Sequence, residues 1–197
     1  MGKNIVVFDI ETKDAFGDVG GREWLQRLEI SVLGAFDYST GEYAVYEEGE
    51  LAAFAERLSM RPLLVGFNSR RFDTPILQRY MPFDVSRLAQ LDIMEEMAKA
   101  LGHRVGLDSV ARATLGAGKS GSGLEAIRLW REGMIEELKR YCLDDVRITR
   151  EVFEYGAKNG ELLYVPKFGN SPGRVKVAWE LEHPEERSGR PEQQSLF

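Results

Sequence analysis

The sequence predicts a mixed α/β fold, in which one sheet is flanked by helices. Near the N-terminus, two strand-like runs are separated by a short turn, which is typical of an antiparallel hairpin. Downstream of them, helical and strand-like segments alternate, which favours parallel pairing in the same sheet. The 197 residues suffice for one domain with a substantial core.

Three strands are expected in the first part of the chain. Residues 3–10 are rich in Val and Ile, as strands are. Residues 30–38 and 42–46 are also strand-like, and the turn Ser39-Thr40-Gly41 between them suits a hairpin.

The middle of the chain is expected to alternate between helices and buried strands. Residues 51–58 carry apolar side chains at helical spacing, and residues 63–67 form a continuous apolar run, as in a buried parallel strand. A short helix should follow at residues 74–80, with a proline in its first turn. Residues 88–93 are a further strand candidate, followed by a helix that ends at about residue 101.

Three helices and a second hairpin complete the expected elements. Residues 107–115 and 124–131 are expected to be short helices, and residues 134–157 show the longest helical pattern, with one apolar stripe. Residues 162–166 and 175–179 should pair around a turn that contains Gly and Pro.

The same patterns predict the domain organisation. Residues 1–157 should form the main domain, and residues 158–180 a hairpin extension of it. Residues 181–197 are rich in Pro, Glu, Arg and Gln, a composition typical of a disordered tail.

Five acidic or phenolic side chains in three short motifs are candidates for a catalytic site. Asp9 and Glu11 end the first expected strand and share one of its faces, because side chains alternate along a strand. Asp73 follows a parallel strand, where the ligands of open sheets gather. Tyr141 and Asp145 are spaced i and i+4, so they share a face of the long helix. If that helix packs against the first strand, four carboxylates converge.

Such a group of carboxylates predicts bound cations. Converging negative charges repel unless they are neutralised, and oxygen ligands suit Mg²⁺ or Mn²⁺. Two divalent ions about 3.5–4 Å apart can activate a water and stabilise the leaving oxygen in phosphodiester hydrolysis. Zinc is disfavoured, because the chain has one cysteine and two distant histidines, His103 and His183.

Each motif taken alone also has an ordinary structural explanation. An Asp-x-Glu triplet is common in loops, and Asp73 or Thr74 can cap a helix. Tyr141 can be a packing residue, and Asp144 with Asp145 can be a solvated acidic pair. The joint pattern is more specific than its parts, because residue type, order and structural context agree.

These motifs resemble those of the DEDD superfamily of 3′→5′ exonucleases, whose domain has a ribonuclease H-like fold. Residues 8–12, Phe-Asp-Ile-Glu-Thr, are similar to the first motif. Residues 68–73 are similar to the second, as it occurs in proofreading domains of family-B DNA polymerases. Residues 141–145 are similar to the Tyr-x-x-x-Asp motif of the DEDDy branch. The resemblance spans residues 3–155, and residues 107–119 look like the preceding segment of stand-alone members.

The resemblance implies a role for each matching residue. Four carboxylates are the expected metal ligands, with the first bridging the two ions: Asp9, Glu11, Asp73 and Asp145. Tyr141 is expected to orient the attacking water. Four neighbours are expected to shape the pocket for the terminal nucleotide: Ile10, Thr12, Asn68 and Phe72.

The expected function is therefore metal-dependent 3′→5′ exonuclease activity at the 3′ ends of DNA, in repair or proofreading. One alternative is an RNA-trimming exonuclease, since recognition of the 2′-hydroxyl depends on local pocket shape. Another is a non-catalytic adaptor for nucleic acid or a clamp, which the filled set of metal-binding positions disfavours.

The last five residues, Gln-Gln-Ser-Leu-Phe, resemble the bacterial sliding-clamp-binding pentapeptide. A disordered tail would present Leu196 and Phe197 to an apolar groove, and Gln193 would add hydrogen bonds. Two apolar residues at a polar terminus are also ordinary, so both explanations stay open. Clamp binding would favour DNA over RNA.

Composition bounds the partners and the compartment. A net charge of −6 argues mildly against a protein that coats nucleic acid, but not against a nuclease whose carboxylates bind cations. Most basic residues are expected to be solvated, except Arg70 and Arg71 beside Asp73.

Asp92, near another strand end, is either close to the metal ligands or, as we favour, a helix N-cap.

Two further patterns exclude other classes of protein. Residues 116–120 resemble a phosphate-binding loop, but Ala113 stands where its first glycine belongs, so nucleoside triphosphate binding is not expected.

No apolar run reaches the roughly 18 residues of a membrane span, and no signal peptide is recognisable. A single cysteine fits a reducing compartment, so a cytoplasmic location without a membrane partner is expected.

Overall fold

The computed structural model describes residues 3–116, 118, 123–166 and 171–179 of the chain. Its centre is a five-stranded sheet with the strand order β3-β2-β1-β4-β5. β1 and β2 pair antiparallel, as do β2 and β3, whereas β4 is parallel to both β1 and β5. The strands are β1 (Ile5–Thr12), β2 (Ile30–Asp37), β3 (Glu42–Glu47), β4 (Leu63–Gly66) and β5 (Gln90–Asp92). The predicted mixed sheet is therefore confirmed.

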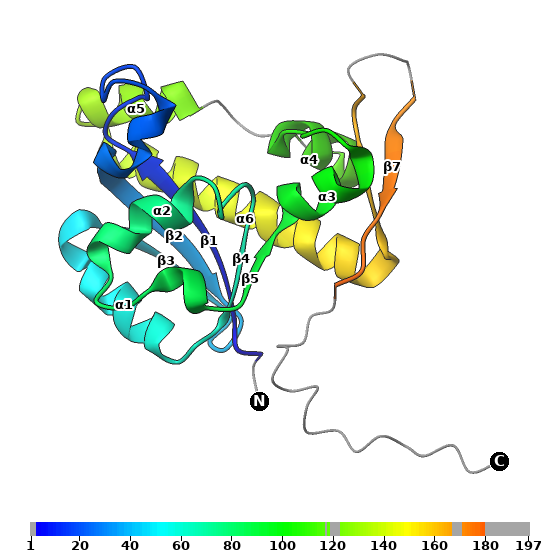
Figure 1. Cartoon of the computed structure of the whole chain (residues 1–197), viewed down its shortest axis with the longest axis horizontal. Helices are drawn as coiled ribbons and strands as arrows, with labels where there is room; N and C mark the ends of the chain where they lie inside the picture. Colours follow the sequence, from blue (N-terminus) through cyan, green and yellow to red (C-terminus); the bar gives the residue numbers. More distant parts are fainter. Residues whose placement is uncertain (1–2, 117, 119–122, 167–170, 180–197) are drawn as a thin grey trace, which may run out of the picture.

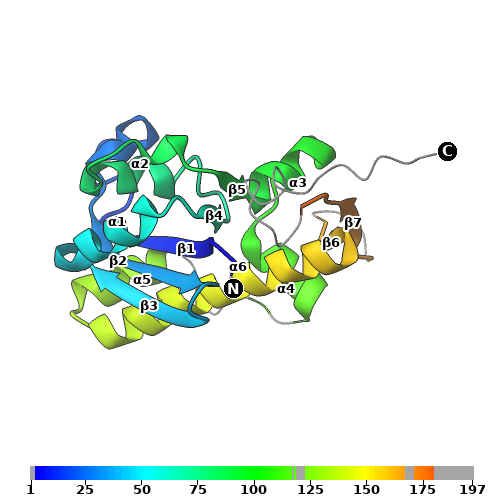
Figure 2. The same ribbon diagram turned by 90° about the horizontal axis from the view of Figure 1, so that it is seen from below.

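Helices cover both faces of this sheet (Figures 1 and 2). One face is covered by α1 and α2, and the other by α5 and α6, with α6 crossing the sheet diagonally. The helices are α1 (Leu51–Ser59), α2 (Asp73–Leu77), α3 (Ile93–Leu101), α4 (Leu107–Leu115), α5 (Gly123–Arg131) and α6 (Ile135–Asn159). The described residues also form four short 3-10 helices: η1 (Arg22–Arg27), η2 (Glu48–Glu50), η3 (Gln78–Tyr80) and η4 (Val85–Arg87).

The central strand β1 changes character along one face. Ile5 and Val7 are buried in the core cluster that contains Val146 of α6. The next two residues on that face are Asp9 and Glu11, so the apolar face becomes acidic at the carboxyl end of the strand. The opposite face stays apolar and packs in a second cluster with side chains of α1 and α2.

Close packing of α6 on the sheet depends on a glycine in β2. Gly34 is the register partner of Asp9. A methyl group on Gly34 would lie 2.9 Å from the Cys142 Sγ and 3.0 Å from the Val146 Cγ2. The missing side chain therefore lets α6 lie directly over β2, next to Asp9.

The terminal hairpin is present, but its second strand was predicted two residues too late. β6 (Glu161–Tyr164) pairs with β7 (Gly173–Lys176) in a separate two-stranded sheet. The predicted strand at residues 175–179 is wrong at its end, because Trp179 packs on α6 instead. Its indole N–H donates to the Phe153 carbonyl at 3.0 Å.

Other differences from the predicted elements follow from weak apolar patterns. η1 was not predicted, and it contains no buried residue that could create a periodicity. The helix predicted at residues 74–80 divides into α2 and the 3-10 helix η3. Within the described ranges, no helix combines the length and apolar character that crossing a membrane requires.

Replacing Gly34 with alanine is expected to destabilise the fold by about 1–3 kcal/mol, because the added methyl overpacks the contact with α6. Gly49→Ala is the matched control, since no atom lies within 4 Å of the added methyl and its effect should range from neutral to about 1 kcal/mol stabilising. Urea unfolding of both variants measures the difference. Equal losses of stability would contradict the role assigned to Gly34.

Candidate metal centre

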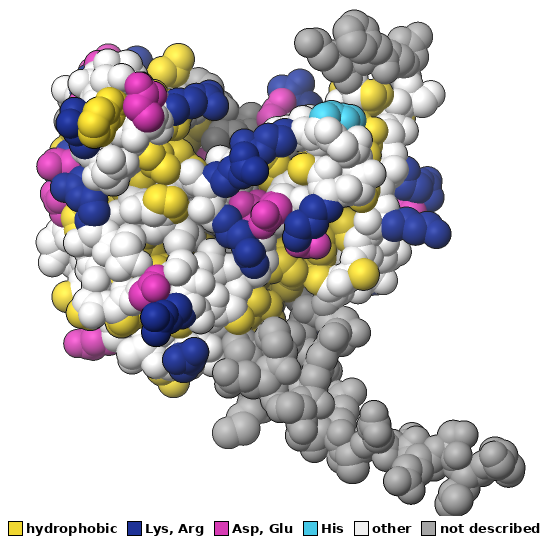
Figure 3. Space-filling model, in the orientation of Figure 1, with side chains coloured by type: hydrophobic (Ala, Val, Ile, Leu, Met, Phe, Trp, Pro, Cys, Tyr) yellow, Lys and Arg dark blue, Asp and Glu magenta, His cyan; other side chains and the backbone are white. Residues whose placement is uncertain are grey.

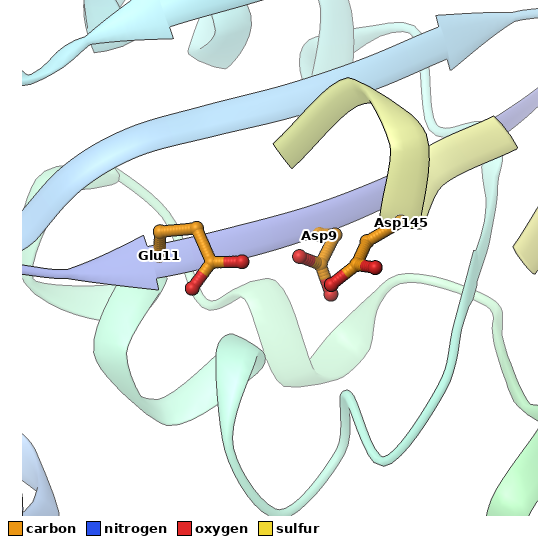
Figure 4. A group of neighbouring side chains, drawn as sticks. All are labelled: Asp9, Glu11 and Asp145. Atoms are coloured by element: carbon orange, nitrogen blue, oxygen red, sulfur yellow. The ribbon is translucent and has the colours of Figure 1, made fainter. Parts of the chain in front are cut away.

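Three carboxylates converge where α6 crosses the end of β1. Asp9 and Glu11 project from one face of β1, and Asp145 projects from α6 toward them (Figure 4). Each offers an oxygen, and these oxygens lie within 4.8 Å of one another. Glu11 and Asp145 are buried, and Asp9 is partly buried. The predicted approach of the long helix to the first strand is thus what the structure shows.

The chemistry of this group suits a divalent cation. Two carboxylates about 5 Å apart repel by roughly 3 kcal/mol at an effective dielectric constant of about 20. Several hard oxygen ligands in one place match the coordination preference of Mg²⁺ or Mn²⁺. Asp9, Glu11 and Asp145 can therefore hold a metal ion.

The fourth predicted ligand, Asp73, occupies a different position in the same pocket. It is buried at the start of α2, and its Oδ1 accepts a hydrogen bond from the Ile10 backbone N–H at 3.0 Å. Pairing between β1 and β4 ends at Val7, so this N–H lies beyond the parallel ladder. Asp73 thus joins the β4–α2 connection to β1. The carboxylates whose oxygens lie within 4.8 Å of one another are those of Asp9, Glu11 and Asp145.

A buried carboxylate for which the sequence favoured a helix-cap role also organises this connection. Asp92 caps α3 by accepting from the Glu95 N–H at 3.1 Å, which confirms the favoured explanation. It also accepts from the backbone N–H groups of Asn68 at 2.8 Å and Arg70 at 3.1 Å. Asn68 is held in the left-handed region, with a φ of 67°. Asp92 therefore fixes the turn that leads into Asp73, a role that its position at a parallel strand end could have suggested.

The carboxylates border a pocket of about 370 Å³. Asp9, Glu11, Asp73 and Asp145 line it. So do all four residues that the resemblance assigned to nucleotide binding, namely Ile10, Thr12, Asn68 and Phe72. The structure brings these side chains together, and their roles stay predictions.

Sequence reasoning missed one wall of the pocket. Phe16, in the loop after β1, lines the pocket and meets Phe72 edge-to-face at 5.8 Å between ring centroids. Leu124 and Ile127 of α5 line it as well. Neither segment belonged to a motif, although an aromatic residue soon after Asp9 and Glu11 was an available signal.

An ion pair joins this loop to α5. Arg131 Nη2 lies 3.3 Å from Asp14 and 2.8 Å from Asp18. The Ala15 backbone N–H and then the Arg131 guanidinium hold the pKa of the Asp18 carboxyl below its usual value. The side chains of Arg131, Asp14 and Asp18 are all exposed to solvent, so the two ion pairs contribute little to folding stability. Their main effect is to orient the loop.

Tyr141 is placed differently from the other predicted catalytic residues. It is buried in a cluster with Ala126 and Leu129 of α5, and it is not among the described residues that line the pocket. Its neighbour Cys142 donates a weak hydrogen bond to the Asp9 carbonyl, with an S···O distance of 3.7 Å. Burial, together with the nearby carboxylates, raises the pKa of the Cys142 thiol well above its ordinary value.

Asp144 lies outside the carboxylate group, as the sequence led us to expect. Its carboxylate pairs with Arg147 at 2.6 Å along α6. Adjacent aspartates on a helix point about 100° apart, so one can reach a site while the other does not. Asp144 is therefore a natural control for Asp145.

The fold and the carboxylate group together are typical of a nuclease. A family model described as the RNase_H superfamily matches residues 6–156, and the chain belongs to that superfamily. No curated protein sequence matches the chain.

Among solved structures, the chain is similar to RNase D from Trypanosoma brucei, with 16% identity and a TM-score of 0.56. That match covers 78% of this chain and 57% of RNase D, and it shows a shared fold. Exonuclease I is also matched at 16% identity, with a TM-score of 0.41 and coverage of 93% of this chain and 53% of that one. A complex of exonuclease I with SSB-Ct has a TM-score of 0.39, at the same identity and coverage. The chain thus spans little more than half of these proteins.

Mn²⁺ is expected to stabilise the folded protein, because ions that bind only the native state raise its unfolding free energy. At 100 times the dissociation constant the gain is about 2.7 kcal/mol. Asp145→Asn should lose most of this gain, whereas Asp144→Asn should keep it. Thermal unfolding with and without Mn²⁺ measures the difference. A full Mn²⁺ response in Asp145→Asn would show that the ion binds elsewhere.

Proposed function

We propose that this protein is a divalent-metal-dependent 3′→5′ exonuclease that hydrolyses the terminal phosphodiester of DNA. The observation that carries the proposal is the group of Asp9, Glu11 and Asp145 at the edge of a nucleotide-sized pocket. Membership of the RNase H superfamily supports hydrolysis as the chemistry. The Tyr-x-x-x-Asp spacing on α6 supports the exonuclease branch.

The carboxylates have distinct tasks in this proposal. Asp9 is drawn between Glu11 and Asp145 (Figure 4), which supports the proposal that it would be the ligand shared by two ions. Asp73, which also lines the pocket, is the remaining ligand and completes the set. Bound divalent ions supply charge neutralisation and a water of lowered pKa. The protein supplies the fixed positions, through β1, α2 and α6.

The terminal nucleotide is proposed to bind against the aromatic and polar residues that line the same pocket. Phe16 and Phe72 lie edge-to-face, and both line the pocket. Stacking of a base on an aromatic ring contributes about 1–3 kcal/mol and is tolerant of sequence. Asn68 adds a polar contact on the same pocket. Such a site accepts an unpaired terminal nucleotide of any base.

Tyr141 is proposed to orient the attacking water. It lies one helical turn before Asp145, and residues at this spacing share a helix face. Its ring is packed in a cluster with Ala126 and Leu129, so α5 helps to hold the ring in place. The position of α5 is therefore part of the catalytic geometry in this proposal.

Wild-type protein with Mg²⁺ or Mn²⁺ is expected to shorten labelled single-stranded DNA from its 3′ end. Asp9→Ala should abolish cleavage, Asp144→Asn should leave it unchanged, and Tyr141→Phe should lower kcat by about 10²-fold with little change in KM. Gel analysis of the products gives the direction and the rate. Equal cleavage by wild type and Asp9→Ala, or none by either, would refute the proposal.

The same assay with matched RNA decides between DNA and RNA as the substrate. Faster cleavage of RNA would establish the RNA-trimming alternative, because the metal site serves either sugar. Binding of either polymer without cleavage under any divalent ion would establish the adaptor alternative.

A docking role for the C-terminal residues is a separate proposal. Gln193, Leu196 and Phe197 lie outside the described residues, so its support is the sequence pattern alone. Deletion of residues 193–197 is expected to remove affinity for a bacterial sliding clamp and to leave cleavage of short DNA unchanged. Surface plasmon resonance with immobilised clamp measures this. Unchanged clamp affinity after the deletion would exclude the docking role.

A further inference from the structure

We infer that Arg71 and Arg104 form a phosphate-binding rim, over which a single strand leaves the pocket. The inference rests on the proposed function, because it concerns the nucleotides that precede the terminal one. The rim joins two segments that are distant in sequence: the β4–α2 connection, which carries Arg71, and the α3–α4 connection, which carries Arg104.

Arg104 lies directly beside the pocket. It is exposed, and its Nη2 donates to the Asn68 Oδ1 at 2.8 Å. Asn68 in turn lines the pocket. One neutral side chain therefore separates this guanidinium from the space assigned to the terminal nucleotide.

Arg71 is exposed and immediately precedes Phe72, which lines the same pocket. Its neighbour Arg70 has a different task, although the sequence suggested the two as a pair. Arg70 donates to the Gln90 carbonyl at 2.6 Å and pairs with Glu95 at 3.4 Å. Arg70 thus secures the turn, whereas Arg71 extends from it into solvent.

The charge balance at the rim differs from that of the whole chain. The protein carries a net charge of −6, yet within the described residues Arg71 and Arg104 form no ion pair with a carboxylate. Lys and Arg side chains, with Asp and Glu side chains among them, lie near the centre of this face, beside the hollow between α2 and α3 (Figure 3). Guanidinium groups bind phosphate oxygens through paired hydrogen bonds, so the rim suits a phosphodiester backbone.

The described residues of α5 and of the loop after β1 suit such a backbone less well. Phe16, Leu124 and Ile127 make this part of the pocket apolar, and the adjacent Arg131 is neutralised by Asp14 and Asp18. A strand whose terminal nucleotide occupies the pocket therefore leaves across Asn68, toward Arg71 and Arg104. The shared ligand chemistry is the phosphodiester backbone, of DNA or RNA.

Salt-dependent binding tests this inference without requiring cleavage. Fluorescein-labelled oligo(dT) and oligo(U) are titrated with protein in EDTA over a range of KCl concentrations, with anisotropy as the readout. Each lost phosphate contact lowers the slope of log K against log[salt] by about 0.7 for single strands. Arg71→Gln/Arg104→Gln should therefore lower the slope by about 1.4 with both polymers.

Two further variants give the controls. Arg87→Gln/Lys158→Gln removes the same charge from exposed positions away from the pocket, Lys158 being roughly 20 Å past Asp145 along α6. Its slope should equal that of wild type. Arg71→Lys/Arg104→Lys keeps both charges and should keep the slope, which shows that the slope depends on charge and not on the shape of the guanidinium group.

The outcomes are distinct. Equal slopes for the two Gln variants, loss of slope in the Lys variant, or an effect with only one of the two polymers would overturn the rim. An Arg-dependent slope in a protein that never cleaves leaves the rim standing and refutes the exonuclease proposal. Cleavage by a protein whose salt slope is unchanged in Arg71→Gln/Arg104→Gln refutes the rim and leaves the exonuclease proposal standing.

Discussion

The packing of α6 onto the sheet at Gly34 is the constraint on which the site depends. Because Gly34 pairs with Asp9 in register, α6 packs tightly on the sheet beside the carboxylate that ends the apolar face of β1. Asp145 lies between Cys142 and Val146, so the turn of α6 that packs on Gly34 also carries this carboxylate. A side chain at Gly34 would separate the two elements and, with them, the carboxylates.

The same packing places repelling charges next to the core. Val7 and Val146 are buried in one cluster, and the acidic group begins at Asp9, the next residue after Val7 on the same face of β1. Burial of Glu11 and Asp145 costs free energy that the core must offset, unless cations neutralise them. Folding stability and metal binding are therefore linked, as expected where function requires like charges to converge.

Parallel strands bring the rest of the site to one edge. β4 and β5 end side by side while β1 continues past them, so Asp92 at the end of β5 reaches the turn after β4 and holds Asn68 and Arg70 by their backbone N–H groups. That turn leads into Asp73, which bonds to β1. The buried carboxylate of Asp92 thus supports the turn that carries Asn68 and Arg71 and leads into Asp73.

The sequence by itself determined the local structure and the chemical types. Periodicity identified the strands and the long helix, and motif spacing placed Asp9 with Glu11, and Tyr141 with Asp145, on common faces. Only the tertiary structure decided that Phe16 and α5 wall the pocket and that Asp92 holds a turn from a distant strand. Periodicity reports which side chains face a core, but not which elements share it. Those partners are set by long-range packing, which leaves no local pattern in the chain.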